Sequence, residues 1–182
     1  MITYSSLGGQ TVKCLGGDKP LVVFPGKSTE KSAWKDAVVL LSTPEEAPKG
    51  STISWPGEYN LAGISIRGVG HKEGQQVSYV AELDGVRALF LSMPLEDWTD
   101  QQLALVGEID MLVVPQGDAK LVQKLVDEFD PRMLVIVSDD AGKLDPDILK
   151  SCGAQGKEHV SEYKLKGSLP AEGREVVVLT KD

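Results

Sequence analysis

The sequence predicts a layered α/β fold, on three observations. The first two thirds of the chain consist of short apolar segments separated by glycine and proline, which is typical of strands. After that, apolar runs alternate with stretches of helical periodicity, as in a β-α-β unit. The apolar runs at residues 110–115 and 133–137 are continuous, which indicates strands that are buried on both faces by covering helices.

Glycine-rich turns delimit the expected strands. Asp84-Gly85 suits a tight hairpin because both residues accept positive backbone dihedrals, and Gly16-Gly17-Asp18 suits a second hairpin turn. We expect strands at residues 11–15, 21–24, 37–41, 64–68, 77–83 and 86–91. The apolar runs at residues 110–115 and 133–137 and a final segment at residues 175–180 complete the set of expected strands.

Capping residues mark the expected helices. Thr99 and Gln102 have the spacing of a capping box, in which each side chain satisfies a backbone N–H of the first turn. Asp118 precedes a stretch with one apolar face. Asp145-Pro146 combines a cap with a first-turn proline, and this last helix is expected to end at Gly153.

Composition narrows the class of protein. The 182 residues fit one domain, 1–182, and no apolar run approaches the roughly 20 residues of a membrane helix. With 27 acidic and 19 basic side chains the net charge is −8, which disfavours nucleic acid as a partner. The first residues show no secretory signal, so a cytoplasmic location is expected and Cys14 and Cys152 are expected to be reduced.

One stretch resembles a known family. Residues 56–68 match the pattern P-G-E-Y-x-x-x-G-x-x-I-x-G, and residues 78–85, 99–105, 110–115 and 131–137 follow in that family's order. The chain thus resembles the metallo-β-lactamase superfamily, close to its ascorbate-6-phosphate lactonase-like metal-dependent hydrolases, over nearly its whole length. The resemblance implies an αβ/βα four-layer sandwich, with two mixed sheets face to face, helices outside and an active site at one sheet edge.

The metal ligands of that family are largely replaced in this chain. Its H-x-H-x-D-H motif holds metal ions that activate water. Here the motif's histidine positions fall on Thr43, Glu45 and Pro48, and its aspartate falls on Ala47. Only Glu45 of these could bind a metal strongly.

The remaining ligand positions are similarly altered. The family's bridging aspartate aligns with Met93 and its last histidine with Ser138, while an L-G-H segment reads Leu7-Gly8-Gly9. His71 alone retains a ligand type at a matching place. The resemblance therefore predicts a vestigial pocket of Thr43, Glu45, Ala47, Pro48, His71, Met93 and Ser138.

We interpret the chain as a non-catalytic metallo-β-lactamase-like protein without a cofactor, a scaffold for binding a partner or assembling with itself. One alternative is a metal-dependent hydrolase with a rearranged site of His71, Glu45 and Asp139, which would use zinc or manganese. Another is a small-molecule-binding module in the old pocket. The sequence does not identify the partner, which could be a protein or a small molecule. It is also compatible with a homo-oligomer.

Other motifs receive structural interpretations. Gly26-Lys27-Ser28 lacks the upstream glycine of a phosphate-binding loop. Tryptophans more commonly pack at the corners of a core than stack on a ligand. The carboxylates of Glu45, Glu46 and Asp139-Asp140 could bind a hard cation such as calcium or magnesium, but we interpret them as ordinary solvated loop charge.

Overall fold

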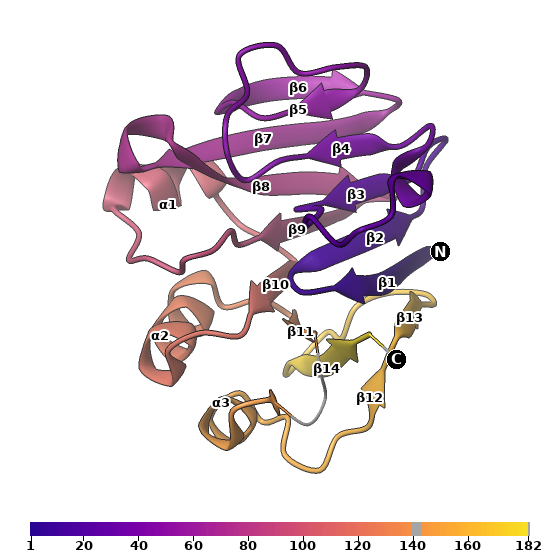
Figure 1. Ribbon diagram of the computed structural model, residues 1–182. Coiled ribbons are helices and arrows are strands. Elements are labelled where there is room, and N and C mark those ends of the chain that lie inside the picture. The colour runs from indigo at the N-terminus through magenta and orange to yellow at the C-terminus, as the bar shows by residue number, and fades with distance from the viewer. Residues whose placement is uncertain (140–142, 182) are drawn as a thin grey trace.

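Two β-sheets packed face to face form the centre of the computed structural model, which describes residues 1–139 and 143–181. Within these residues, three α-helices lie together on one side of the molecule, and a single-turn 3₁₀-helix lies on the opposite side (Figure 1). The predicted α/β sandwich of two mixed sheets is therefore confirmed.

The sheets have six and eight strands in the described part of the chain. In spatial order the first sheet contains β13 (Glu162–Leu165), β1 (Ile2–Gly8), β2 (Thr11–Leu15), β3 (Leu21–Val23), β4 (Val38–Leu40) and β5 (Thr52–Ile53). The second contains β12 (His159–Val160), β14 (Glu175–Thr180), β11 (Met133–Ser138), β10 (Met111–Pro115), β9 (Val86–Phe90), β8 (Gln76–Leu83), β7 (Ile64–His71) and β6 (Gly57–Leu61). The helices are α1 (Asp100–Val106), α2 (Ala119–Phe129) and α3 (Pro146–Ser151), with 3₁₀ turns η1 (Lys31–Trp34) and η2 (Lys72–Gly74).

Local sequence signals account for several element boundaries. Asp84 and Gly85 join β8 to β9 with φ angles of 48° and 77°, as the hairpin prediction required. Thr99 and Gln102 form the predicted capping box at the start of α1. Asp118 caps α2 through the N–H of Leu121, and Asp145 caps α3 through the N–H of Asp147, so the three predicted helix starts are confirmed.

The sheets pack through alternating side chains. In β7, Ile64 and Ile66 point into the core between the sheets, whereas Val69 points to the helix-covered face. Successive side chains of a strand alternate between the two faces of a sheet, so this register also fixes the direction of every later residue of β7.

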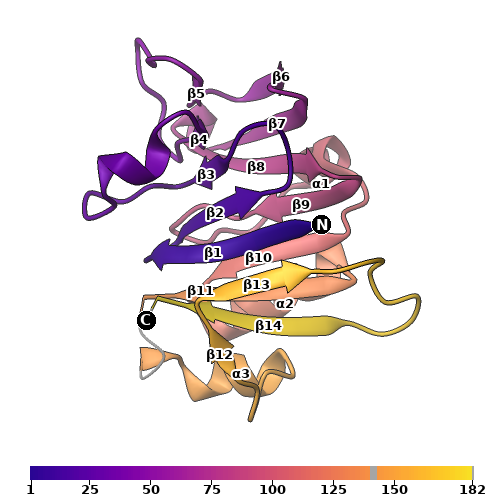
Figure 2. The same ribbon diagram turned by 90° about the vertical axis from the view of Figure 1, so that its right-hand side faces the viewer.

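Helical cover is unequal on the two sheets. Helices α1, α2 and α3 pack on the eight-stranded sheet, and Figure 2 shows α1 and α2 behind the strands. The outer face of the six-stranded sheet has only η1, which lies in the crossover between the parallel strands β3 and β4. Such crossovers usually contain an α-helix. Here the expected outer helical layer is reduced to one turn, which leaves part of this face open.

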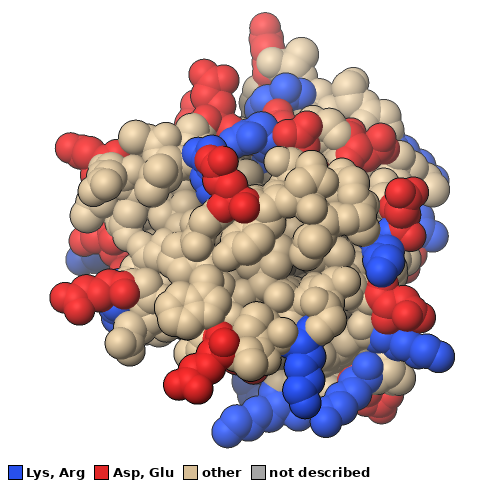
Figure 3. Space-filling model, turned by 90° about the horizontal axis from the view of Figure 1, so that it is seen from above, with Lys and Arg blue, Asp and Glu red and all other residues tan. Residues whose placement is uncertain are grey.

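The end of the molecule that carries β5 and β6 has a distinct charge distribution. Viewed from above, charged side chains of both signs lie around its margin and uncharged surface occupies its centre (Figure 3). The excess negative charge is therefore not concentrated on this face. None of the helices in residues 1–139 and 143–181 has the length and hydropathy needed to cross a bilayer.

Candidate functional site

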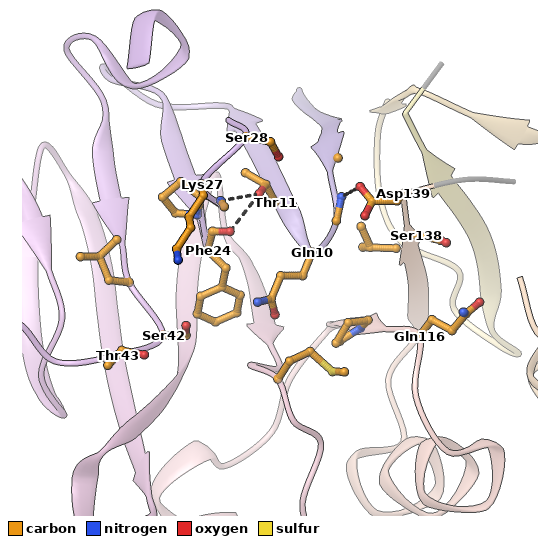
Figure 4. Close-up of a pocket in the computed structure, with 18 of the residues that line it drawn as sticks. Gln10, Thr11, Phe24, Lys27, Ser28, Ser42, Thr43, Gln116, Ser138 and Asp139 are labelled. Carbon is orange, nitrogen blue, oxygen red and sulfur yellow. Dashed lines mark hydrogen bonds between the residues drawn. The ribbon is translucent and has the colours of Figure 1, made fainter. Parts of the chain in front are cut away.

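A cavity opens where the parallel strands of both sheets end. Its volume of about 900 Å³ is in the range of small-molecule sites. Ligands of open α/β sheets bind outside the carboxyl ends of the strands, which is where this cavity lies. We call it the cleft; it is lined by residues 8–11, 24–28, 41–45, 93, 115–116, 137–139 and 143 (Figure 4).

The loop after β4 is held in place by both sheets. The hydroxyl of Tyr79 donates to the carbonyl oxygen of Leu41 at 2.7 Å, which connects β8 to the beginning of this loop. The N–H of Glu45 donates to Oγ of Ser54 at 3.0 Å, and its carbonyl oxygen accepts from Nε1 of Trp55 at 2.8 Å. The loop therefore presents its side chains from a fixed backbone.

The loop after β3 is fixed by two threonines. Oγ1 of Thr11 donates to the carbonyl oxygen of Phe24 at 2.9 Å, and the N–H of Gly26 lies within hydrogen-bond distance of Oγ1 of Thr11 and of Thr29. Phe24 has a φ of 52°, an uncommon conformation for a residue with a side chain. Further along the same loop, Lys27 points its ammonium group into the cleft (Figure 4).

Asp139 connects the two sheets across the cleft. The N–H of Gly9, in the turn between β1 and β2, donates to Oδ1 of Asp139. This contact uses one carboxylate oxygen of Asp139, the residue that the sequence offered as a metal ligand in a rearranged site. Asp139 therefore has a structural role in this protein. Asp140, its neighbour in the predicted carboxylate cluster, lies outside the described residues.

His71 belongs to a buried network. The residue has an exposed fraction of 4%, and its ring packs edge-on against Trp98 with ring centroids 4.6 Å apart. Nε2 lies 3.1 Å from Oγ of Ser78, and Nδ1 lies 3.1 Å from Nε2 of Gln102. Both ring nitrogens therefore have hydrogen-bond partners, and His71 is not among the residues that line the cleft.

The hydrogen bonds of Gln102 determine the tautomer of His71. Oε1 of Gln102 accepts from the N–H of Thr99 at 2.8 Å, so the nitrogen of this amide faces His71. Nδ1 of His71 must then accept, and Nε2–H donates to Ser78. Burial lowers the pKa of His71, while Glu96 raises it and Lys72 lowers it to smaller extents. The ring is thus a neutral, structural imidazole.

The predicted vestigial pocket is only partly assembled. The residues that line the cleft are Thr43, Glu45, Met93 and Ser138, together with the alternative ligand Asp139. Those placed elsewhere are Ala47, Pro48 and His71. The chain after Glu45 runs along the outer face of the six-stranded sheet, where Ala47 lines a neighbouring hollow and Pro48 is exposed. His71 lies two residues after Val69 in β7, so the two side chains are on the same face of the sheet. That face is the one covered by the helices.

The residues of the cleft do not fit a catalytic zinc centre. Its described lining contains two carboxylates, Glu45 and Asp139, and no histidine or thiol. Catalytic zinc requires three protein ligands and an open position. Within the part of the chain that the structure describes, no three His, Cys, Asp or Glu side chains gather closely enough to hold one ion.

Comparison with known proteins identifies the fold. No protein-family model and no curated protein matches the sequence. Among solved structures, a protein described as a Zn-dependent hydrolase of the metallo-β-lactamase superfamily, from Thermotoga maritima, is similar over 99% of both chains, with a TM-score of 0.78 and 21% identity. The chain has the metallo-β-lactamase fold.

Two further solved structures are similar to this chain at lower TM-scores. Igni18, a metallo hydrolase from Ignicoccus hospitalis, has a TM-score of 0.58 and 11% identity over 98% of this chain and 95% of its own. CmlA, a diiron β-hydroxylase from Streptomyces venezuelae, has a TM-score of 0.59 and 9% identity over 98% of this chain and 53% of its own. These names describe metal enzymes, whereas the described cleft of this chain lacks a matching ligand set.

The cleft also contains polar groups that are not metal ligands. The amide of Gln10 points into it (Figure 4) and makes no hydrogen bond with any residue the structure describes; its Oε1 is fully covered. Hydroxyl groups of Ser28, Ser42 and Thr43 also line it. The sequence did not single out Gln10, although it directly follows Gly8-Gly9, where the family's L-G-H segment falls.

Proposed function

We propose that this metallo-β-lactamase-fold chain is non-catalytic and uses its cleft to bind a small polar molecule. The observation that supports this proposal is the composition of the cleft. The strand ends that form it are in place, yet the polar side chains of its lining are mostly hydroxyl, amide and lysine groups. Such groups orient a ligand through hydrogen bonds and do not polarise water as a zinc ion does.

Gln10 is the main candidate for ligand recognition. A buried acceptor without a partner costs free energy of about 1–3 kcal/mol, which a ligand N–H or O–H would recover. The amide also offers donors beside this acceptor, so it fits a ligand group with an adjacent donor and acceptor, such as a carboxamide. Lys27 supplies a positive charge at the same opening.

A second candidate is a hydrolase with a rearranged metal site. Glu45 and Asp139 both line the cleft, and carboxylates are suitable ligands for manganese. Against this candidate, Asp139 accepts the N–H of Gly9 and His71 has partners at both ring nitrogens.

Metal titration tests the non-catalytic assignment. After treatment with a chelator, the protein is expected to show no stoichiometric Zn²⁺ or Mn²⁺ site tighter than about 10 µM in calorimetry, because too few ligands converge. It is also expected to show no metal-dependent hydrolysis of ester, lactone or phosphodiester substrates. A tight site with hydrolysis that Glu45→Gln or Asp139→Asn abolishes would establish the second candidate instead.

Replacing Gln10 tests the ligand-binding proposal. In a thermal-shift screen of small polar metabolites, we expect at least one compound to stabilise the wild type. The Gln10→Ala variant should bind that compound about 5- to 30-fold more weakly in calorimetry, since it loses one to two hydrogen bonds. Lys120→Gln, on the exposed surface of α2, is the control and should bind normally. No stabilising compound, or equal binding by Gln10→Ala, would contradict the proposal.

A further inference from the structure

A second hollow adjoins the cleft on the outer face of the six-stranded sheet. It has a volume of about 840 Å³ and lies beside η1, where that sheet lacks an α-helix. Pro25, Gly26, Lys27, Leu41 and Glu45 line both this hollow and the cleft. We call it the lysine groove, after the four lysines that line it: Lys19, Lys27, Lys31 and Lys49.

The charge of the lysine groove is opposite to that of the whole chain. Its four lysines face only two acidic lining residues, Asp36 and Glu45, although the chain carries a net charge of −8. All four lysines are exposed, and none forms an ion pair or side-chain hydrogen bond with a described residue. Positive charge without a protein partner attracts anions.

The floor of the lysine groove is apolar. Val22, Ala37 and Val39 form a small buried cluster on the outer face of this sheet, and Trp34 and Leu41 pack against it. Ala37, Val39, Trp34 and Leu41 line the groove itself. An apolar floor contributes binding free energy in proportion to the apolar ligand area that it removes from water.

Trp34 also has an unsatisfied polar atom. Its Nε1 is buried and has no hydrogen-bond acceptor among the residues that the structure describes. A buried indole N–H usually has a partner. The side chain is partly exposed, belongs to the single turn of η1 and lines the groove.

We propose that the lysine groove is a second binding site, for an organic anion that joins a carboxylate or sulfonate to an apolar body. The lysines would neutralise the anionic group, and the body would cover Trp34, Leu41 and Val39. A small inorganic anion would leave the apolar floor unused, and a neutral hydrocarbon would leave the lysines unused. The volume of the groove accommodates a ten-carbon chain.

Titration with decanoate below its micellar concentration tests this site. Tryptophan fluorescence and calorimetry of the full chain should show saturable binding. The Lys31→Gln/Lys49→Gln variant should bind decanoate about 3- to 10-fold more weakly, because each exposed ion pair contributes modestly. These two lysines line the groove and do not line the cleft. Trp34→Phe should remove most of the fluorescence change.

Matched controls separate this site from general electrostatics and from the cleft. Lys120→Gln/Lys157→Gln changes the net charge equally at exposed positions away from the groove and should bind decanoate as the wild type does. Gln10→Ala, in the cleft, should also bind normally. Decyltrimethylammonium, with the opposite charge, should not compete.

Several results would overturn the proposal. Absence of saturable decanoate binding by the folded wild type would do so, as would equal weakening by the two lysine double variants. Equal binding of the cationic amphiphile would show that only apolar surface is involved. Binding of hexaglutamate without binding of decanoate would assign the groove to acidic peptides instead.

Discussion

Replacing His71 with alanine is expected to lower the free energy of unfolding by about 3 kcal/mol. The imidazole fills space beside Trp98 and hydrogen-bonds to Ser78 and Gln102, all within a buried network. Its removal leaves a cavity and takes a partner from each of these two side chains. Chemical denaturation at pH 7.5 measures the change in the free energy of unfolding.

The cost of this substitution should decrease at acidic pH. Burial lowers the pKa of His71 in the folded protein, so between that pKa and the ordinary value near 6.5 the unfolded chain binds a proton that the folded protein does not. Stability of the wild type is therefore lost as pH falls through about 6.5. The alanine variant lacks this contribution, so the difference between the two proteins should narrow from pH 7.5 to pH 5.

His159 provides the matched control. It lies in the short strand β12 with intermediate exposure, and no side-chain partner is seen for it within the described ranges. His159→Ala should change stability by no more than about 0.5 kcal/mol. An effect of His71→Ala as small as that of the control, or one that does not vary with pH, would contradict the structural role assigned to His71.

Sequence alone could predict the elements that depend on local chemistry. The capping box of Thr99 and the hairpin at Asp84-Gly85 each use a few neighbouring residues, and both are confirmed. Strand β1, by contrast, was missed because its sequence Ile2–Gly8 mixes serine and threonine with apolar residues. Its inward side chains become evident only once β2 and β13 pair with it.

The site was less predictable because it depends on which face a residue occupies. Thr43, Met93 and Ser138 lie at or just after strand ends, and all three line the cleft. His71 was assigned by its place in the sequence, but alternation from Ile64 and Ile66 would have directed it to the helix-covered face. The lysine groove depends on a missing helical layer, which periodicity within one segment could not reveal.

Restoring ligands at the strand ends is expected to create a zinc site. In the Thr43→His/Met93→Asp/Ser138→His variant, the side chains that replace the three native ones enter the cleft from the ends of β4, β9 and β11. Two histidines, one aspartate and water complete a zinc coordination sphere. We expect a Kd of about 1 µM or tighter, or about 8 kcal/mol of binding free energy, where the wild type has no such site.

Moving one histidine by a few residues should remove most of the gain in Zn²⁺ affinity. The comparison therefore tests whether the position of the ligands matters and not only their type. Pro48→His/Met93→Asp/Ser138→His contains the same ligand types, but Pro48 lies outside the cleft, so Zn²⁺ binding should weaken at least about tenfold. Cobalt absorption reports four-coordinate geometry, and circular dichroism verifies folding.

If histidine at the buried Ser138 prevents folding, Thr43→His/Met93→Asp with native Glu45 supplies three ligands instead. Two results would contradict this prediction. One is equal Zn²⁺ affinity of the two triple variants, and the other is no Zn²⁺ binding by the folded variants that place every ligand in the cleft. Either would mean that these strand ends cannot form a zinc site.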